Sequence, residues 1–252
     1  MPSTRSRRPS HPSKSLADQF RPIVTLHRSF RERGNVKVDV DAAHARIRAG
    51  RAAFDSTAVL SGAGDLTKHF HRTVIAFERV GIASTSQADA LQKADVDPTM
   101  LIVNWAHADS IPRSSHLRLV RQVAGIVGNA LLVRASEEVS KGISFAGWKR
   151  STCPCCGASP DMALTTDRRR TLVCWRCDTM WRTDKRGCLS CGAHDAPTLA
   201  RVASPYGYEL AICNSCGRYL KERAGTPKHS LIVERALTAG LDEAAQLRGL
   251  RA

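Results

Sequence analysis

Four Cys-x-x-Cys pairs in the second half of this chain constrain its fold more than any other feature. Residues 153–177 read CPCCGASPDMALTTDRRRTLVCWRC, and the pattern returns as CLSC at 188–191 and as CNSC at 213–216. Eight of the nine cysteines belong to these pairs: Cys153, Cys156, Cys174, Cys177, Cys188, Cys191, Cys213 and Cys216. In a reducing compartment, pairs with this spacing hold metal far more often than they form disulfides.

The spacing predicts two metal sites. Each pair brings two thiolates onto one ion, so two pairs make one tetrahedral four-sulfur site and four pairs make two. A residue with positive φ after the second cysteine turns backbone N–H groups toward the sulfurs, and Gly157, Gly192 and Gly217 occupy three of these positions. Asp178 occupies the fourth and is the next most tolerant kind of residue.

The order in which the pairs combine follows from the segments between them. Met162, Leu164 and Thr166 alternate before a polar turn and a second short apolar run, a pattern typical of a β-hairpin. A hairpin would bring the first two pairs together, and the same reasoning combines the last two across a segment that ends in YGYELAI. We therefore expect pairing in chain order, with interleaved pairing as the alternative.

Four thiolates close the coordination shell of a metal, whereas a catalytic zinc keeps one position open. We therefore predict structural sites and no catalytic residues. All-thiolate sites suit zinc and also a single iron, so both metals stay open. Dithiol redox catalysis is a weaker alternative because the pairs have no βαβ setting. Cys155 lies inside the first pair, and we interpret it as a spectator thiol, with a redox or alternative-ligand role as the other reading.

The first 152 residues contain no cysteine, and their periodicity is helical. Leu66, Phe70, Val74 and Phe77 recur at spacings of three and four, which lines one face of a helix. Ser84 with Gln87 has the pattern of a capping box, and Asp97 followed by Pro98 indicates a second helix start. The segment from His116 is long and apolar, which predicts a central buried helix.

These patterns predict an α+β chain with an N-terminal all-helical domain of about four or five helices. Two tandem rubredoxin-like or zinc-ribbon modules, each with four cysteine ligands, and a short C-terminal helical segment follow it. The predicted parts are a basic, largely disordered tail (1–37), the helical domain (38–147), the double four-cysteine metal-ribbon domain (148–225) and the C-terminal helical segment (226–252).

The net charge of +15 raises the alternative of a double zinc-ribbon protein that binds nucleic acid. However, residues 1–51 carry +8 of this charge, from 12 Lys/Arg and 4 Asp/Glu. Residues 151–225 carry a formal +4, which two divalent ions and eight thiolates cancel because their combined charge is −4. The Pro/Ser-rich segment 1–15 lacks apolar residues to bury, and we expect it to be disordered.

No apolar run approaches the roughly 18 to 20 residues that span a bilayer, so we expect a soluble protein without membrane insertion. Arg7 and Arg8 are not followed by an apolar stretch, and we do not interpret them as part of an export signal. We expect a cytoplasmic location.

The residues around the cysteine pairs also resemble those of a known protein family. Trp148, then CPCCG with Pro160, CWRCDTMW, CLSCG and YGYELAICNSCGRYLK together resemble the cysteine-rich core of the formate dehydrogenase accessory proteins, the FdhE family. Trp181 follows Cys177 by four residues, and Tyr219 follows Cys216 by three. The resemblance covers about residues 148–223.

The resemblance implies a cytoplasmic accessory factor, not an enzyme, that matures respiratory formate dehydrogenase. Its partner would be the molybdenum- or tungsten-containing catalytic subunit, which it would contact before that subunit becomes active. The metal sites look like that of rubredoxin, so the resemblance implies iron as strongly as zinc. Some aromatic residues of this region must form the ribbon core and others could face a partner, and the sequence leaves that division open: Trp175, Trp181, Tyr206, Tyr208 and Tyr219.

Overall fold

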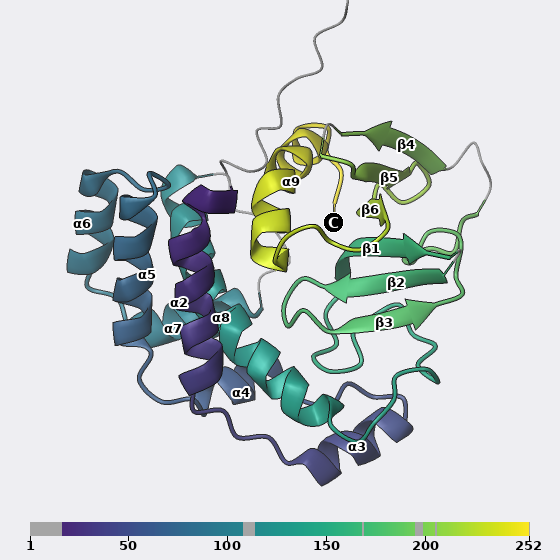
Figure 1. Ribbon diagram of the computed structural model, residues 1–252, viewed down its shortest axis with the longest axis horizontal. Helices are drawn as coiled ribbons and strands as arrows, with labels where there is room; N and C mark the ends of the chain where they lie inside the picture. The colour runs from purple at the N-terminus through teal and green to yellow at the C-terminus, as the bar shows by residue number, and fades with distance from the viewer. Residues whose placement is uncertain (1–16, 108–113, 168, 195–198, 205, 252) are drawn as a thin grey trace, which may run out of the picture.

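The computed structural model describes residues 17–107, 114–167, 169–194, 199–204 and 206–251. Seven helices precede the cysteines and one follows them among these residues (Figure 1). The helices are α2 (Arg21–Arg33), α3 (Val40–Arg48), α4 (Ser56–Ser61), α5 (Thr67–Arg79), α6 (Thr85–Lys93), α7 (Pro98–Trp105), α8 (Ser115–Ser140) and α9 (Leu231–Leu247). The predicted α+β class, with its order of helices, cysteine region and C-terminal helix, is confirmed.

The helix starts read from the sequence are present. Ser84 and Gln87 form a capping box at α6, and the Asp97 carboxylate accepts a hydrogen bond from the Thr99 N–H with Pro98 at the first position of α7. The long helix expected from His116 is α8, and α2, α5 and α7 pack around it (Figure 1). The four apolar residues expected on one face of α5 are all buried: Leu66, Phe70, Val74 and Phe77.

Helix α2 contradicts the prediction that residues 1–37 form a largely disordered tail. Ile23, Leu26, His27 and Phe30 recur at helical spacing and are buried. The prediction weighed the excess of basic residues, but several of those side chains lie on the outer face of α2, where charge does not oppose burial of the other face. Segment 1–15, for which we predicted disorder, lies outside the described residues.

One six-stranded sheet contains both cysteine modules. Its strands, in the order β3-β2-β1-β6-β5-β4, are β1 (Pro160–Thr166), β2 (Arg169–Cys174), β3 (Met180–Thr183), β4 (Leu199–Ala203), β5 (Glu209–Cys213) and β6 (Tyr219–Ala224). Each module is a three-stranded antiparallel unit, and β1 confirms the predicted hairpin by pairing with β2. The parallel pair β1 and β6 joins the two units, which the sequence had indicated only as tandem modules.

The two faces of the sheet have different surroundings. Helix α9 covers one face, where Met162 and Leu164 pack with Leu231 and Leu241 (Figure 1). Lys221 and Tyr219 of β6 donate hydrogen bonds to the Asp242 carboxylate of α9, at 2.7 and 2.9 Å. The opposite face bears Glu222 and a cleft, described below. None of the helices among the described residues is both long and apolar enough to cross a membrane.

The main buried core runs across the predicted boundary at residue 148. It joins Val127 and Leu131 of α8 to Cys153, Cys174 and Trp181 of the first cysteine module. Trp105 of α7 makes part of this junction, because its ring lies against α8 on one side and meets Trp175 edge-on, with 5.1 Å between ring centroids. The first module therefore shares its apolar interior with the helices.

Close packing of Trp105 on α8 predicts the effect of one substitution. A Cβ added at Gly128 would lie 2.6 Å from Cε3 of Trp105, so Gly128→Ala forces the ring to move. We expect overpacking to lower the free energy of unfolding by about 1 to 3 kcal/mol, in spite of the better helix propensity of alanine. Denaturant unfolding followed by circular dichroism measures this change.

The matched control is Gly240→Ala in α9. An added Cβ there meets nothing within 4 Å, so this variant should gain up to about 1 kcal/mol from helix propensity alone. A Gly128→Ala protein as stable as the Gly240→Ala protein would contradict the tight contact between Trp105 and α8.

Candidate metal centres

The structure gathers the eight paired cysteines into two groups of four. Within each group the sulfur atoms lie within 4.8 Å of one another: Cys153, Cys156, Cys174 and Cys177 in the first cluster, and Cys188, Cys191, Cys213 and Cys216 in the second cluster. The pairing in chain order is therefore confirmed. In each module the second pair closes the end of a strand, and the hairpin before it brings the first pair alongside.

The sulfur spacing fits a four-sulfur metal site. The contacts are 3.5 Å for Cys153–Cys177 and 3.4 Å for Cys156–Cys174 in the first cluster, and 3.6 Å for Cys188–Cys216 in the second. A disulfide needs about 2.05 Å. A tetrahedron with metal–sulfur bonds of about 2.3 Å has edges of about 3.8 Å, close to the observed spacing. Each cluster could hold one zinc or iron ion.

The four positions after the cysteine pairs all have positive φ, as predicted. The φ values are 75° at Gly157, 55° at Asp178, 78° at Gly192 and 66° at Gly217. Each of these residues donates its N–H to the carbonyl oxygen of the first cysteine in its pair, at 2.8 to 3.1 Å. The turn presents neighbouring N–H groups to sulfur, as where Arg176 N–H lies 3.4 Å from the Cys174 sulfur.

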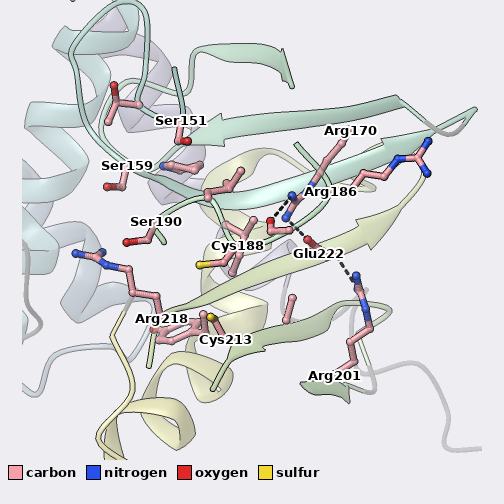
Figure 2. Close-up of a pocket in the computed structure, with 17 residues that line it drawn as sticks. Ser151, Ser159, Arg170, Arg186, Cys188, Ser190, Arg201, Cys213, Arg218 and Glu222 are labelled. Atoms are coloured by element: carbon pink, nitrogen blue, oxygen red, sulfur yellow. Dashed lines mark hydrogen bonds and ion pairs between the residues drawn. The ribbon is translucent and has the colours of Figure 1, made fainter. Parts of the chain in front are cut away.

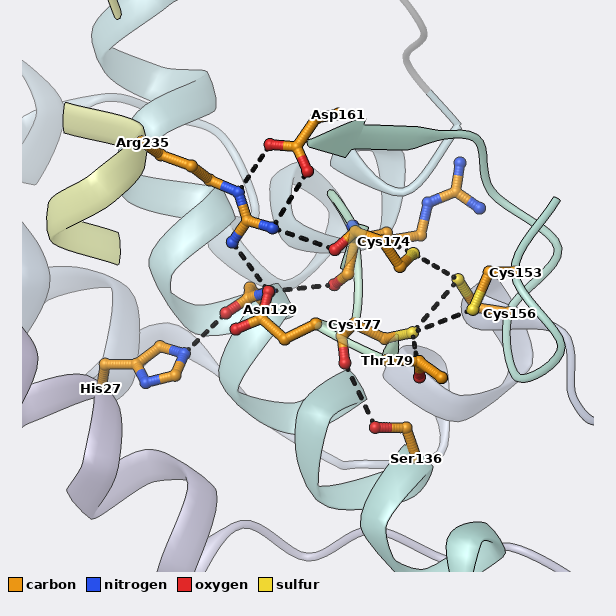
Figure 3. A network of polar contacts seen from close by, with 12 residues as sticks. His27, Asn129, Ser136, Cys153, Cys156, Asp161, Cys174, Cys177, Thr179 and Arg235 are labelled. Atoms are coloured by element: carbon orange, nitrogen blue, oxygen red, sulfur yellow. Dashed lines mark hydrogen bonds and ion pairs between the residues drawn. The ribbon is translucent and has the colours of Figure 1, made fainter. Parts of the chain in front are cut away.

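Asp178 takes the place of glycine at the turn after the second pair, and its side chain binds helices on both sides. Its carboxylate accepts hydrogen bonds from the side-chain amide of Asn129 on α8, at 3.0 Å, and from the guanidinium of Arg235 on α9, at 2.7 Å (Figure 3). The backbone cost of positive φ at a non-glycine residue is thus offset by two contacts that glycine cannot make.

Arg235 is the cation of this network. Its guanidinium binds both carboxylate oxygens of Asp161, at 2.8 and 3.3 Å, and donates to the carbonyl oxygen of Cys174 at 2.9 Å (Figure 3). Burial by itself lowers the pKa of Arg235, but the charges of Asp161 and Asp178 outweigh it and raise that pKa well above its usual range. Arg235 therefore stays charged and ties β1, the 174–177 loop and α9 together.

The network extends to α2. Asn129 also donates to the carbonyl oxygen of Arg176 at 3.2 Å, and its own oxygen lies 2.7 Å from His27 Nε2. Because the amide group of Asn129 donates, its oxygen accepts, which places the His27 proton on Nε2. Burial lowers the pKa of His27, so the ring is neutral near neutral pH. Nearby, the Ser136 hydroxyl donates to the carbonyl oxygen of Cys177 at 3.2 Å.

Cys155 belongs to neither cluster. It is buried, and its carbonyl oxygen accepts a hydrogen bond of 3.0 Å from the N–H of Phe54, the residue before the α4 N-cap. The carbonyl oxygen of Pro154 accepts a parallel bond of 2.9 Å from Ala53. The main chain at Cys155 thus anchors the first loop to the helices, while the spectator role of its thiol stays a prediction.

The five aromatic residues of the ribbon differ in how far they are buried. Trp181, Tyr208 and Tyr219 are buried. Trp175 is half-buried between Trp105 and two guanidinium groups, those of Arg121 and Arg176, at 5.5 and 4.9 Å from its ring. Tyr206 is exposed over 39% of its surface. Four of the five aromatics are therefore used inside the protein.

The second cluster opens onto a cleft of about 300 Å³ on the sheet face away from α9 (Figure 2). Cys188 and Cys213 line it. Glu222 of β6 lies at its floor, where its carboxylate binds the guanidinium groups of Arg170 and, at 2.6 Å, Arg201. Arg170 also donates to the carbonyl oxygens of Lys185 and Gly187, at 2.9 and 3.3 Å, which fixes the link between the modules.

Sequence reasoning missed the residues that support the first cluster: His27, Asn129, Asp161 and Arg235. One signal was available: Asp178 stands where the other three pairs have glycine, which indicates that its side chain makes a contact that glycine cannot make. The partners of Asp178 carried no local signal, since Asn129 and Arg235 lie 49 and 57 residues away in the chain.

The network predicts that glycine will be harmful at position 178 although the backbone favours it. Asp178→Gly relieves the φ of 55° but leaves the partly buried guanidinium of Arg235 with one carboxylate fewer. We expect the free energy of unfolding to fall by about 1 to 3 kcal/mol, measured by denaturant unfolding of the metal-loaded protein.

Asp167 supplies the control for this prediction. It has a φ of 50° in the exposed turn between β1 and β2, so Asp167→Gly removes backbone strain without touching the network and should be neutral or stabilising by up to about 1 kcal/mol. Equal responses of the two variants would show that the Asp178 carboxylate contributes nothing.

The sequence matches no protein-family model and no curated protein. Among solved structures, the chain is similar to the FdhE protein from Pseudomonas aeruginosa, with a TM-score of 0.59 and 16% sequence identity. The match covers 97% of this chain and 94% of the other, well beyond the cysteine-rich part in which the sequence resemblance lies. The chain therefore has the fold of FdhE.

Proposed function

We propose that this protein is a formate dehydrogenase accessory protein that matures the enzyme by binding its molybdenum- or tungsten-containing catalytic subunit. The observation that carries the proposal is the likeness to the FdhE structure along nearly the whole chain, helices included. It agrees with the resemblance of residues 148–223, which depends on a separate feature, the order and spacing of the cysteine pairs. A cytoplasmic location is part of the proposal.

In this proposal the eight paired cysteines hold two metal ions, zinc or rubredoxin-type iron, and the protein has no catalytic activity of its own. Four thiolates per ion leave no coordination position for a substrate. The first cluster supports the 174–177 loop, to which α8 and α9 both bind. Metal would therefore stabilise the joint between helices and sheet, and with it the surface offered to the client.

Metal content is the first test. Protein purified anaerobically should contain two ions per chain, because each group of four sulfurs fits one ion. Cys188→Ser combined with Cys191→Ser should reduce the content to one ion and leave the helical circular dichroism signal intact, since no cysteine of the second cluster belongs to the main core. Elemental analysis of the same samples measures both, and one ion in the parent protein would contradict the two-site proposal.

Genetics tests the function itself. A host that lacks this protein should still synthesise the formate dehydrogenase catalytic polypeptide, detected by immunoblotting, but lose most formate dehydrogenase activity. Full activity in the deletion strain would refute the proposal. Complementation with Cys153→Ser plus Cys156→Ser should fail, because the first cluster belongs to the core that joins sheet and helices.

Cys155→Ser is the matched control for that experiment. The variant changes a neighbouring buried cysteine that lies outside both clusters, and it should complement nearly as well as the parent protein. Failure of Cys155→Ser with normal protein levels would keep the accessory function and assign a role to this thiol.

Nucleic-acid binding is the alternative outcome for a basic chain with cysteine ribbons. A complex with nucleic acid must weaken steeply as salt rises, whereas a packed contact with the catalytic subunit need not. Tagged protein incubated with the catalytic subunit and, separately, with duplex DNA or RNA at rising salt distinguishes the two. Retention of the subunit at high salt supports the accessory role.

A further inference from the structure

The protein encloses its two cysteine clusters to different degrees. All four thiols of the first cluster are at most 7% exposed. In the second cluster only Cys213 is buried, while Cys188 and Cys216 are half-buried and Cys191 is exposed. The donor sets and sulfur spacings are nearly the same, so any difference in behaviour comes from the surroundings.

Helices and loops outside the sheet hold the loops of the first cluster. Ser136 and Asn129 of α8 bind carbonyl oxygens of the 174–177 loop, and Arg235 of α9 binds a third (Figure 3). The segment before α4 binds the 153–156 loop through two backbone hydrogen bonds. Opening this cluster would therefore break contacts with three separate parts of the chain, at a cost close to that of global unfolding.

The loops of the second cluster have lighter support. Loop 188–191 closes on itself, with the Gly192 N–H bonded to the Cys188 carbonyl at 3.0 Å and the Cys188 N–H to the Ala193 carbonyl at 2.7 Å. Its contact with the main core is made by the partly buried Leu189. Loop 213–216 is held by the backbone of Arg251, which bonds to Gly217 at 2.8 Å and to Tyr219 at 2.9 Å. These contacts lie at the surface and can open locally.

Removal of an ion from a closed four-thiolate shell needs an incoming ligand that reaches the metal, or protons that reach the thiolates. Burial denies both routes at the first cluster. At the second cluster the cleft reaches the half-buried Cys188 (Figure 2). Cys191, outside the cleft, is exposed. A volume of about 300 Å³ is at the lower end of sites for small molecules.

We propose that the second cluster is a metal-exchange site, which releases and reloads a thiophilic divalent cation through the cleft while the first cluster retains its ion. The exchange is ligand substitution without any redox change. An acceptor donates electron pairs to the cation, the four metal–sulfur bonds break, and the thiolates take up protons from solvent. Reloading reverses these steps.

The cleft also favours one kind of acceptor. Arg186, Arg201 and Arg218 line it together with Glu222, so cationic side chains outnumber the carboxylate around the approach to the cluster. Arg186 is exposed at this rim. An anionic acceptor, one that binds metal through carboxylates or thiolates, is attracted to such a rim, and a neutral acceptor is not.

The test uses the full-length protein loaded with two zinc ions. On addition of excess EDTA, zinc should leave in two phases of equal size, with the first at least about tenfold faster than the second. Brief alkylation with N-ethylmaleimide during the first phase, followed by mass spectrometry, locates the released thiols. Label should appear on the second cluster and be absent from Cys153, Cys156, Cys174 and Cys177.

Two results would overturn the exchange site. Release in a single phase would show that the clusters are equivalent, and early label on the first cluster would reverse the assignment. Both readouts use the parent protein, so neither depends on whether a cysteine variant folds. Neither depends on formate dehydrogenase, so this experiment and the genetic one can fail separately.

Arg186→Ala tests the cleft as the route. The variant should slow fast-phase release to EDTA by about two- to fivefold and leave release to the neutral chelator TPEN unchanged. Arg79→Ala on α5 removes the same charge from an exposed position on a helix far from the sheet, and should change neither rate (Figure 1). Equal slowing by both arginine variants would mean that overall charge matters and that the cleft does not guide the acceptor.

Discussion

The paired guanidinium of Arg235 is the interaction on which the rest of the architecture depends. It lies on α9 and binds two other parts of the chain, namely β1 through Asp161 and the 174–177 loop through Asp178 and Cys174. A partly buried cation that loses its carboxylates is left poorly solvated, so the network disfavours arrangements in which α9 or the loop is displaced. Through Asn129 the same network fixes the sheet against α8, and metal in the first cluster would add to an already defined structure.

Short-range features of the structure could be predicted from the sequence because their causes are local. The spacing of cysteines sets the loops, positive φ follows the second cysteine of each pair, and the hairpin of Met162 and Leu164 sets which pairs meet. Features that depend on distant partners could not be predicted. His27 and Asn129 are 102 residues apart, and Arg235 and Asp161 are 74 apart. Helix α2 was not predicted because the excess of basic residues in segment 1–37 outweighed the helical spacing of Ile23, Leu26 and Phe30.

The two clusters place the same ligand set in two different surroundings within one sheet. Ribbon modules of this size have little apolar interior, so a metal supplies most of their stability when they stand alone. Here the first module shares the buried core of the helical part. The second module packs against α9, where Ile212 and Tyr219 contact Ala245. Such support allows one cluster to be exposed at the cleft without loss of the fold.

The parallel pairing of β1 and β6 has a consequence beyond the single chain. It joins the first strand of one module to the last strand of the other, so the modules are related head to tail and their association is not closed. The outer strands β3 and β4 are the counterparts of β6 and β1, and the same pairing repeated between molecules would build an open-ended filament. Arg182 is exposed on β3, and a charged side chain on an edge strand opposes such polymerisation.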